Sequence, residues 1–449
     1  MPDKREEFES LFETVDRVYT LDGSRYANID IKKGLRNRDG TGVLVGLTNI
    51  GEVHGYVIEE MEKMPDEGKL SYRGIDLEEL VQGFQEDHRF GFEEVVYLLL
   101  MGGLPSPLEL NDMQSYMDEV APLPEGFVED MIFKAPSPNI MNKLARCVLA
   151  SYSYDKAADD ISTRNVLRQS MELIARFPTF VAYSYAAKAH YCDNKSLIIH
   201  NPLPGRSIAE NFLHMIRPDG IYTDEEARVL DLALVVHAEH GGGNNSAFAT
   251  HVLSSSGTDT YSAIAAAVGS LKGPKHGGAN AKVIGMIEDI KAHVPNTNDE
   301  GALSDYLIKI LNKEAYDNSG LIYGMGHAIY TLSDPRAVLL KEQARLMAQK
   351  TDREEEFMLY ESIERLTPEL LRGIKGNDKV VCANVDMYSG FVYQCLDIPP
   401  ELYTPLFAIS RIAGWCAHRL EEIRFSSRII RPAYKSVTKH KNYVPLSDR

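Results

Sequence analysis

The chain has 449 residues, of which 44% are hydrophobic and 25% charged, and its 48 basic and 65 acidic side chains give a net charge of −17. This composition is typical of a soluble globular protein that is large enough for about two or three domains of ~150 residues each. The excess of acidic residues argues against nucleic-acid binding, which needs a basic face, but it leaves room for a small anionic ligand held by local arginines.

Apolar residues recur at helical spacing through most of the chain. The first stripe follows Asp76 and Glu79, which form a capping-box pattern, and the next, within residues 92–100, ends at Gly102 and Gly103. Similar stripes occupy residues 110–120, 140–150, 163–190 and 206–216. These segments predict a mainly helical protein.

One predicted strand pair interrupts this pattern near the N-terminal end. Val43–Thr48 and Val53–Ile58 are rich in residues that favour strands, and the short turn Asn49-Ile50-Gly51-Glu52 separates them. The sequence therefore predicts an all-α fold with one small N-terminal β-hairpin.

Two histidines, His237 and His240, lie three residues apart ahead of three glycines, and His251 follows further on. Histidines at this helical spacing face one way and could bind zinc, but no cysteine or carboxylate stands at a convincing third-ligand spacing. They could instead be packing residues, or hydrogen-bond donors to an anionic substrate. The sequence leaves these interpretations open, and we favour the last.

His276 follows Gly273 and Pro274, which end one helix, and a new helix is expected from Ala279 to Lys291. Because the positive end of a helix dipole disfavours imidazolium, such a histidine stays neutral and can donate a hydrogen bond to a carbonyl that becomes an enolate. The alternative is a turn histidine chosen for local fit.

A glycine loop, residues 324–326, precedes His327, and the Asp334-Pro335 pair beyond it is a strong helix start. Arg336 then falls in the first turn, near backbone N–H groups that the glycine loop leaves free. This combination predicts an anion pocket.

Three charged residues of the C-terminal part complete the candidate list. Asp386 stands at the start of an apolar helix, where it could be an N-cap or a general base that reaches a substrate C–H proton. Arg411 precedes Trp415, the only tryptophan, and Arg431 lies in an irregular tail. Either arginine alone would be interpreted as a surface residue.

The cysteines and the apolar segments indicate the cellular compartment of the protein. No apolar run approaches the ~18 residues of a membrane helix, and the acidic first residues lack the apolar core of a secretory leader. The five cysteines form no Cys-x-x-Cys motif: Cys147, Cys192, Cys382, Cys395 and Cys416. We expect a cytoplasmic protein with reduced, buried cysteines and no membrane contact.

In their order along the chain, these motifs resemble the citrate synthase family. The matching segments are His240-Gly-Gly-Gly-Asn, Gly273-Pro-Lys-His-Gly-Gly-Ala-Asn, Gly324-Met-Gly-His, Asp334-Pro-Arg, Asn384-Val-Asp, Arg411 and Arg431-Pro. The likeness extends upstream to Leu70-Ser-Tyr-Arg-Gly-Ile-Asp and Phe92-Glu-Glu-Val, so it covers roughly residues 35–435. The resemblance implies a helical homodimer in which a small domain, 278–388, closes over a large domain, 1–277 completed by 389–449.

The resemblance also implies roles for individual residues. Asp386 would remove a proton from the methyl group of acetyl-CoA, neutral His276 would stabilise the resulting enol(ate), and His327 would polarise the ketone of oxaloacetate. The oxaloacetate-binding residues would be His240, Arg336, Arg411 and Arg431, the last contributed by the neighbouring subunit. Citryl-CoA would be hydrolysed in the same closed site.

The CoA contacts are less fully implied. Backbone of Gly324, Met325 and Gly326 would approach the adenine, and Lys32, Lys33, Arg36 and Arg38 are only candidates for the phosphates. Many bacterial relatives carry arginine where this chain has Ala328. No metal and no cofactor is expected, because the CoA thioester is a substrate.

These expectations describe a cytoplasmic acyltransferase that makes citrate from oxaloacetate, acetyl-CoA and water. The nearest alternative is a 2-methylcitrate synthase that uses propionyl-CoA, since one methylene is worth only ~1–3 kcal/mol in a hydrophobic pocket. A catalytically silent helical binding protein and a metallohydrolase built on His237 and His240 are the alternatives from other classes.

Overall fold

The computed structural model describes residues 8–9, 11–13, 15, 28–37, 39–60, 62–376, 380–425 and 428–449. The chain divides into two units, Met1–Leu47 and Thr48–Arg449. The described part of the first unit includes a 3-10 turn, η2 (Lys33–Leu35), and a bridge between Arg36 and Gly42. The second unit contains all the predicted catalytic and oxaloacetate-binding residues.

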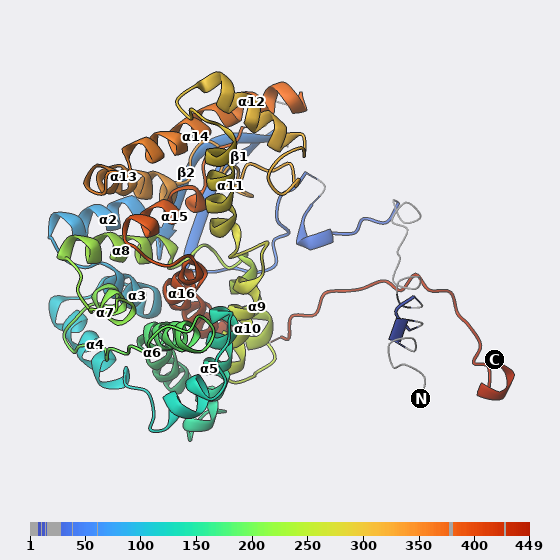
Figure 1. Ribbon diagram of the computed structural model, residues 1–449. Coiled ribbons are helices and arrows are strands. Elements are labelled where there is room, and N and C mark those ends of the chain that lie inside the picture. Colours follow the sequence, from blue (N-terminus) through green and yellow to red (C-terminus); the bar gives the residue numbers. More distant parts are fainter. Residues whose placement is uncertain are drawn as a thin grey trace. The chain divides into compact units, whose positions relative to one another are not determined.

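The second unit is built mainly from helices (Figure 1). Its earlier helices are α2 Leu77–Glu86, α3 Phe92–Met101, α4 Pro107–Val120, α5 Ile140–Ser151, α6 Thr163–Tyr191, α7 Ile208–Ile216 and α8 Asp224–His237. The later ones are α9 Asn245–Ser254, α10 Thr260–Lys272, α11 Ala279–His293, α12 Glu300–Leu311, α13 Pro335–Lys350, α14 Glu354–Lys375, α15 Val385–Cys395 and α16 Tyr403–Phe425. Short turns are the π-helical η3 Val128–Phe133 and the 3-10 turns η4 Tyr152–Tyr154, η5 Pro400–Leu402 and η6 Leu446–Asp448.

The predicted helical stripes are confirmed, and each lies on a buried face. In α2 the buried residues are Leu77, Leu80, Val81 and Phe84. Asp76 caps this helix by accepting a hydrogen bond from the backbone N–H of Glu78. The α3 helix ends at Gly102, whose φ of 92° is the left-handed conformation that glycine adopts without strain.

The predicted hairpin is right in one strand and wrong in the other. Strand β1 (Gly51–Glu59) contains the expected segment 53–58, but it pairs with β2 (Glu62–Tyr72), and β3 (Ile75–Asp76) pairs with β2 in turn. Residues 43–48 form no strand, and Leu44 and Leu47 are 85% and 91% exposed. The alternation rule missed β2 because it is largely polar and contains Pro65.

Helix α16 runs through the core of the second unit. It packs against α3, α6, α8, α9 and α10, and Trp415, Arg411 and Arg419 are among the largest fully buried side chains. In Figure 1, α11 to α15 lie beside the sheet and α4 to α7 lie toward the opposite end. Polar side chains on a buried helix need hydrogen-bond partners inside the protein, so α16 is a suitable element to line a binding site.

Two further expectations concern membranes and cysteines. None of the helices in the described ranges is both long and apolar enough to cross a membrane. All five cysteines are free thiols, and Cys147, Cys395 and Cys416 are buried. The expectation of burial is wrong for Cys192, which is exposed, and Cys382 is half-buried.

Candidate active site

Several of the predicted residues converge from distant parts of the chain around His240, in the turn between α8 and α9. His240 is 6% exposed, and its ring Nε2 has no hydrogen-bond partner among the described residues. Burial, followed by the charges of two arginines and two other histidines, lowers the pKa of His240 well below its usual value; these neighbours are Arg336, His327, Arg411 and His276. His240 is therefore a neutral ring at the centre of a positively charged cluster.

Helix α16 supplies one wall of this cluster. Phe407, Arg411, Gly414, Trp415 and His418 recur at helical spacing and so share one face, which meets the α8–α9 junction. Arg411 donates through Nε to the carbonyl of His237, and its guanidinium lies 4.5 Å from the centre of the Phe407 ring. These contacts fix the direction of the side chain.

Arg411 is an unsatisfied buried cation. It is 1% exposed, and neither Nη1 nor Nη2 has a hydrogen-bond partner in the described residues. Burial lowers the pKa of the Arg411 guanidinium to about 10, because the charged form is held away from water. A planar pair of unused N–H groups matches a carboxylate, so this guanidinium is arranged to receive an anion.

Arg336 is a second buried guanidinium, 3% exposed, but it already has a partner. Asp334 accepts from Arg336 Nε at 3.0 Å and from Nη2 at 2.8 Å. Asp334 also caps α13 and accepts from the backbone N–H of Val385 at 3.2 Å. The predicted helix start at Asp334 is confirmed, whereas sequence reasoning missed that this residue aims Arg336 and joins the beginnings of α13 and α15.

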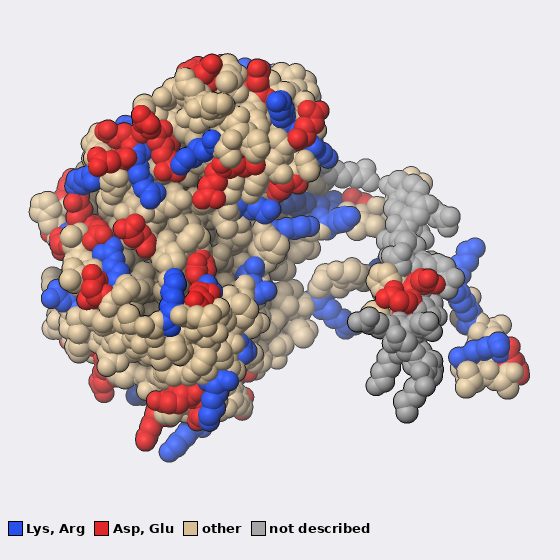
Figure 2. Space-filling view, in the orientation of Figure 1, with Lys and Arg blue, Asp and Glu red and all other residues tan. Residues whose placement is uncertain are grey.

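The positive charge of the site is local. On the face of the molecule in Figure 2, acidic and basic side chains are interspersed over the helical body. By contrast, Arg336 and Arg411 are buried together, so water screens their attraction for an anion less than it would at a surface arginine. An acidic protein can therefore still hold a small dianion.

The ring of His327 is held in one orientation. Its Nδ1 accepts hydrogen bonds from the backbone N–H groups of Ile329 at 3.1 Å and Tyr330 at 3.2 Å. The Tyr330 ring stacks on it at 4.7 Å, and the His240 ring meets it edge-on at 5.2 Å. Since Nδ1 is an acceptor, this geometry assigns the proton of the neutral ring to Nε2, which is then a donor.

The loop 324–326 is tied to the segment that carries Asp386. Gly326 N donates to the carbonyl of Cys382 at 2.7 Å, and Asn384 N donates to that of Gly324 at 2.8 Å. A Cβ on Gly324, whose φ is 82°, would lie 2.8 Å from the Met387 sulfur, so only glycine fits there. A pocket of 340 Å³ opens beside this loop; among the residues that line it are Leu321, Met325, Gly326, His327, Leu371 and Val381.

Asp386 lies in the first turn of α15, and the interpretation of it as the N-cap is wrong. The cap is Asn384, whose Oδ1 accepts from the Asp386 N–H at 3.0 Å. Burial raises the pKa of the Asp386 carboxyl to about 6, although the charges of Arg336 and Arg411 oppose that rise. No described residue donates a hydrogen bond to its carboxylate, so these oxygens are open to a proton from a bound molecule.

His276 lies in the turn between α10 and α11. Burial, with a smaller contribution from Arg411, lowers the pKa of this histidine to about 4, so it is neutral at pH 7. Its Nε2 is 3.0 Å from Ser246 Oγ, which also accepts from Trp415 Nε1 at 3.0 Å. Sequence reasoning missed Ser246, because only the fold brings the start of α9 to this turn.

Among the predicted residues of the second unit, Arg431 is not brought into the cluster. Arg431 is exposed, in an extended segment that begins where Ile430 N donates to Ser255 Oγ at 3.0 Å. The phosphate candidates Lys32, Lys33 and Arg36 belong to the first unit, and Arg38 lies outside the described residues.

The zinc interpretation of His237 finds no geometric support. Its Nδ1 lies 2.7 Å from the carbonyl of Ala233, one turn back in α8, and its ring packs edge-on against Phe407 at 4.8 Å. Within the described ranges, no three His, Cys, Asp or Glu side chains are grouped so that they could hold a metal ion. His237 also supplies the carbonyl that orients Arg411, which is a packing and positioning role.

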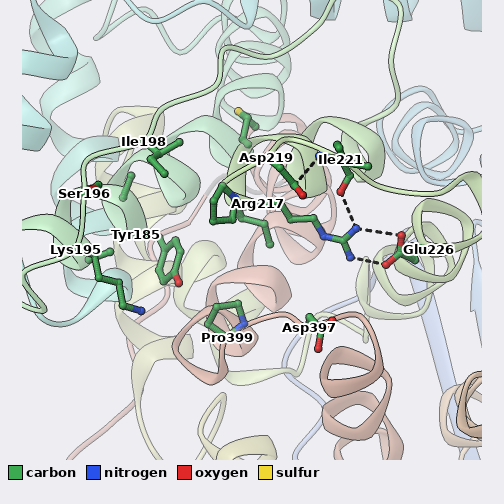
Figure 3. A pocket seen from close by; sticks show the side chains of 15 residues that line it. Tyr185, Lys195, Ser196, Ile198, Arg217, Asp219, Ile221, Glu226, Asp397 and Pro399 are labelled. Atoms are coloured by element: carbon green, nitrogen blue, oxygen red, sulfur yellow. Dashed lines mark hydrogen bonds and ion pairs between the residues drawn. The ribbon is translucent and has the colours of Figure 1, made fainter. Parts of the chain in front are cut away.

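A larger pocket, of 600 Å³, lies apart from this cluster and contains none of the predicted residues (Figure 3). Its arginine, Arg217, donates to both carboxylate oxygens of Glu226 and to the carbonyl of Leu396. The guanidinium in this pocket is therefore already satisfied, unlike the buried one of Arg411.

Comparisons with known proteins agree with the motif analysis. A family model described as "Citrate synthase, C-terminal domain" matches residues 39–433. Citrate synthase of Synechocystis sp. is 34% identical over 85% of this chain and 89% of its own, and 2-methylcitrate synthase 1 of Corynebacterium glutamicum is 30% identical over 93% and 98%. A ternary complex of Thermoplasma acidophilum citrate synthase with carboxymethyl coenzyme A and oxaloacetate is similar with a TM-score of 0.74 and 26% identity, over 93% of this chain and 99% of that one.

Proposed function

The chain belongs to the citrate synthase family of acyltransferases, and on that premise we propose that it condenses acetyl-CoA with oxaloacetate and water to give citrate and CoA. The observation that carries this proposal is the grouping of His276, His327, Arg336 and Arg411 around His240, with Asp386 beside the same two arginines. A catalytically silent binding protein would have no need of a carboxyl group with a raised pKa in such a cluster.

Oxaloacetate is the ligand that we assign to the arginines. One carboxylate pairs with the two unused nitrogens of Arg411, and Arg336, held by Asp334, faces the other. His240 Nε2, which has no partner in the described residues, donates to the same molecule. Support comes from the relative of Thermoplasma acidophilum, which was solved with oxaloacetate and a CoA analogue.

The reaction then uses three groups in turn. Asp386 takes a proton from the methyl group of acetyl-CoA, and neutral His276 stabilises the enol(ate) oxygen by donating from Nδ1. That tautomer makes His276 Nε2 an acceptor, so the Ser246 hydroxyl, 3.0 Å away, must turn its one proton to this nitrogen from Asn244 Oδ1, its acceptor at 2.9 Å. His327 donates from Nε2 to the ketone oxygen of oxaloacetate, so the new carbon–carbon bond forms at a polarised carbonyl, and water then releases CoA from citryl-CoA.

We assign the CoA adenine to the loop 324–326 and the 340 Å³ pocket beside it. The loop is joined by backbone hydrogen bonds to the segment before Asp386, so the position of a bound CoA is coupled to that of the base. The thioester is a substrate, and our proposal includes no metal and no cofactor.

The larger assembly is part of the same proposal. Residues 278–388 form a small domain that closes on a large domain, 1–277 completed by 389–449, and His276 and Asp386 lie within two residues of the two junctions. The protein acts as a cytoplasmic homodimer in the tricarboxylic acid cycle. Arg431 of the partner subunit completes the oxaloacetate site. This explains why Arg431 is exposed, whereas the other oxaloacetate-binding residues, His240, Arg336 and Arg411, are buried.

The acyl group is the finer question, because relatives of both kinds, citrate and 2-methylcitrate synthases, are about equally similar. In the presence of oxaloacetate, we expect the enzyme to release free CoA thiol from acetyl-CoA. The kcat/KM for acetyl-CoA should be at least ~10-fold above that for propionyl-CoA. The measurement is a thiol-release assay with each acyl-CoA, with and without oxaloacetate. The reverse preference would establish 2-methylcitrate synthesis, and no release with either would favour a silent protein.

The raised pKa of Asp386, about 6, predicts how the reaction depends on pH. A base must be deprotonated, so kcat/KM for acetyl-CoA at saturating oxaloacetate should fall ~10-fold per pH unit below a midpoint at or above about pH 6. The bound dianion adds negative charge and can only move that midpoint upward. His276, with a pKa of about 4, is neutral near this midpoint.

The pH profile is checked on enzyme returned to pH 7.5 after each incubation, so that loss of fold is separated from protonation. A limb that begins only below pH 5, or one that falls ~100-fold per unit from its start, would contradict the assignment of a single carboxylate base.

A further inference from the structure

One buried carboxylate next to the site has no part in the proposed reaction. Glu239 precedes His240 and is 0% exposed. It lies between two glycines: a Cβ on Gly51 would be 2.9 Å from Glu239 Cγ, and one on Gly414 would be 2.2 Å from Glu239 Oε2. Two segments of the chain thus leave room for this one side chain, which indicates a specific role for it.

The two oxygens of Glu239 differ. Oε1 accepts hydrogen bonds from His418 Nε2 at 2.9 Å and from the backbone N–H of Gly241, whereas Oε2 has no partner in the described residues. Burial alone would raise the pKa of the Glu239 carboxyl, but His418 and Arg411 outweigh that cost and lower it. Glu239 is therefore a carboxylate in the dry interior.

His418 begins a chain of hydrogen bonds that leads outward from Glu239. His418 Nδ1 is 3.2 Å from His251 Nε2, and His251 Nδ1 is 2.7 Å from Glu422 Oε2, whose side chain is 11% exposed. A carboxylate therefore stands at each end of this chain of hydrogen bonds, with the two imidazoles between them.

Further charged groups lie on the His418 side of the chain. Burial and then the charge of His418 lower the pKa of His251. Glu421 Oε2, at 3.9 Å from His418 Nδ1, adds negative charge there, and the nearby cations are Arg73 and Arg411. His418 is the group that does most to lower the pKa of the Glu239 carboxyl.

Glu239 is in turn the charge that most favours the buried guanidinium of Arg411. Gly414, against which Glu239 packs, is three residues after Arg411 on α16, so the two side chains act on the same face of that helix. No hydrogen bond joins them, and both Nη atoms of Arg411 stay unpartnered within the described residues. The carboxylate balances the cation without taking the place of a ligand.

We propose that Glu239 is a positioning residue of the dicarboxylate site, which balances the charge of Arg411 while the site is empty and is held as a carboxylate by His418, His251 and Glu422. This inference rests on the proposed function, because it takes Arg411 as a ligand of the substrate carboxylate. Its consequence is that the need for Glu239 falls when a substrate carboxylate arrives, since the ligand then supplies the negative charge.

The variant Glu239→Gln keeps the shape and the acceptor oxygen but removes the charge. We expect it to lower the melting temperature of the empty enzyme by several degrees, and we expect saturating oxaloacetate or an unreactive dicarboxylate mimic to restore most of that loss. By linkage, the variant should bind the mimic more tightly than the native protein, with a Kd lower by ~10-fold. Thermal unfolding with and without the mimic, and calorimetric titration, measure both effects.

Glu93→Gln is the matched control, because Glu93 on α3 is also buried, accepts from one backbone N–H and has one oxygen without a partner in the described residues. Its cost should be the same with and without the mimic. A Glu239→Gln loss that the mimic leaves unchanged, or no loss at all, would overturn the proposal.

A double-mutant cycle tests the charge balance without any ligand. In an Arg411→Met background, Glu239→Gln should cost little or nothing, and additive costs would overturn the inference. If the native protein fails to bind a dicarboxylate, the proposed function fails, while the cycle still decides whether Glu239 acts through Arg411. Should Glu239→Gln not fold, Glu422→Gln, at the outer end of the hydrogen-bond chain, provides a second test. We expect a smaller fall in melting temperature that the mimic again restores, and no such fall would count against the proposal.

Discussion

Replacing Asp386 with asparagine should lower kcat by at least ~100-fold, the loss typical of removing a general base. The change keeps the size of the side chain but removes its ability to accept a proton. Because Asn384, not Asp386, caps α15, the helix start should survive the substitution. Oxaloacetate binding should weaken little, since no described residue relies on a hydrogen bond to the Asp386 carboxylate.

Steady-state turnover, calorimetric oxaloacetate binding and thermal unfolding of the variant separate these effects. Asp289→Asn is a suitable control, because Asp289 is a carboxylate on α11 that accepts a hydrogen bond from Tyr306 and lies outside the cluster. It should retain native turnover. Near-native kcat in a folded Asp386→Asn protein would show that another group removes the methyl proton.

The sequence predicted the helices well because each has to bury one apolar stripe. It predicted the hairpin less well, since the pairing of β2 depends on what lies against it. A Cβ on Gly68 would be 2.1 Å from the carbonyl oxygen of Ser333, and Thr331 Oγ1 accepts from Asp66 N at 3.1 Å. These contacts with the loop after His327 hold a polar strand in place, and no local pattern contains them.

In the site, too, some features could be predicted from the sequence and others depend on tertiary contacts. The order of the motifs led to His240, His276, His327, Arg336 and Arg411, and the fold brings these residues together. What the sequence could not provide is which partner holds each of them. Asp334 was read as a helix cap and is also the partner of Arg336, because an Asp-Pro-Arg sequence does not reveal which way the arginine turns.

Helix α16 shows why such partners are hard to predict. Arg411, His418 and Arg419 would mark a solvent-exposed face in an ordinary amphipathic helix, yet all three are buried. Their burial follows from how many other helices surround α16, which is a property of the whole fold. Arg419 donates to Thr260, Ser254 and Thr258, whereas both Nη atoms of Arg411 lack a partner in the described residues, and only the tertiary structure distinguishes the two arginines.

Arg431 gives the other large expected effect, because it is the one predicted oxaloacetate ligand that this chain does not bring to its own cluster. Arg431→Ala and Asp386→Asn should each be nearly inactive as homodimers. If Arg431 serves the partner subunit's site, mixing and refolding the two variants should restore one intact site per heterodimer, since each site takes Asp386 from one chain and Arg431 from the other. Random pairing then predicts roughly a quarter of native activity.

A second mixture makes that recovery interpretable. Asp386→Asn with His327→Gln changes two residues that serve the site of the same chain, so neither site of that heterodimer is intact and no activity should return. Mass spectrometry under native conditions, with one variant isotope-labelled, shows whether heterodimers form in both mixtures. If they form and Arg431→Ala is not rescued by Asp386→Asn, then Arg431 acts within its own subunit or outside any site. A dianion held by three cations would then need its third cation from the residues around Arg336 and Arg411.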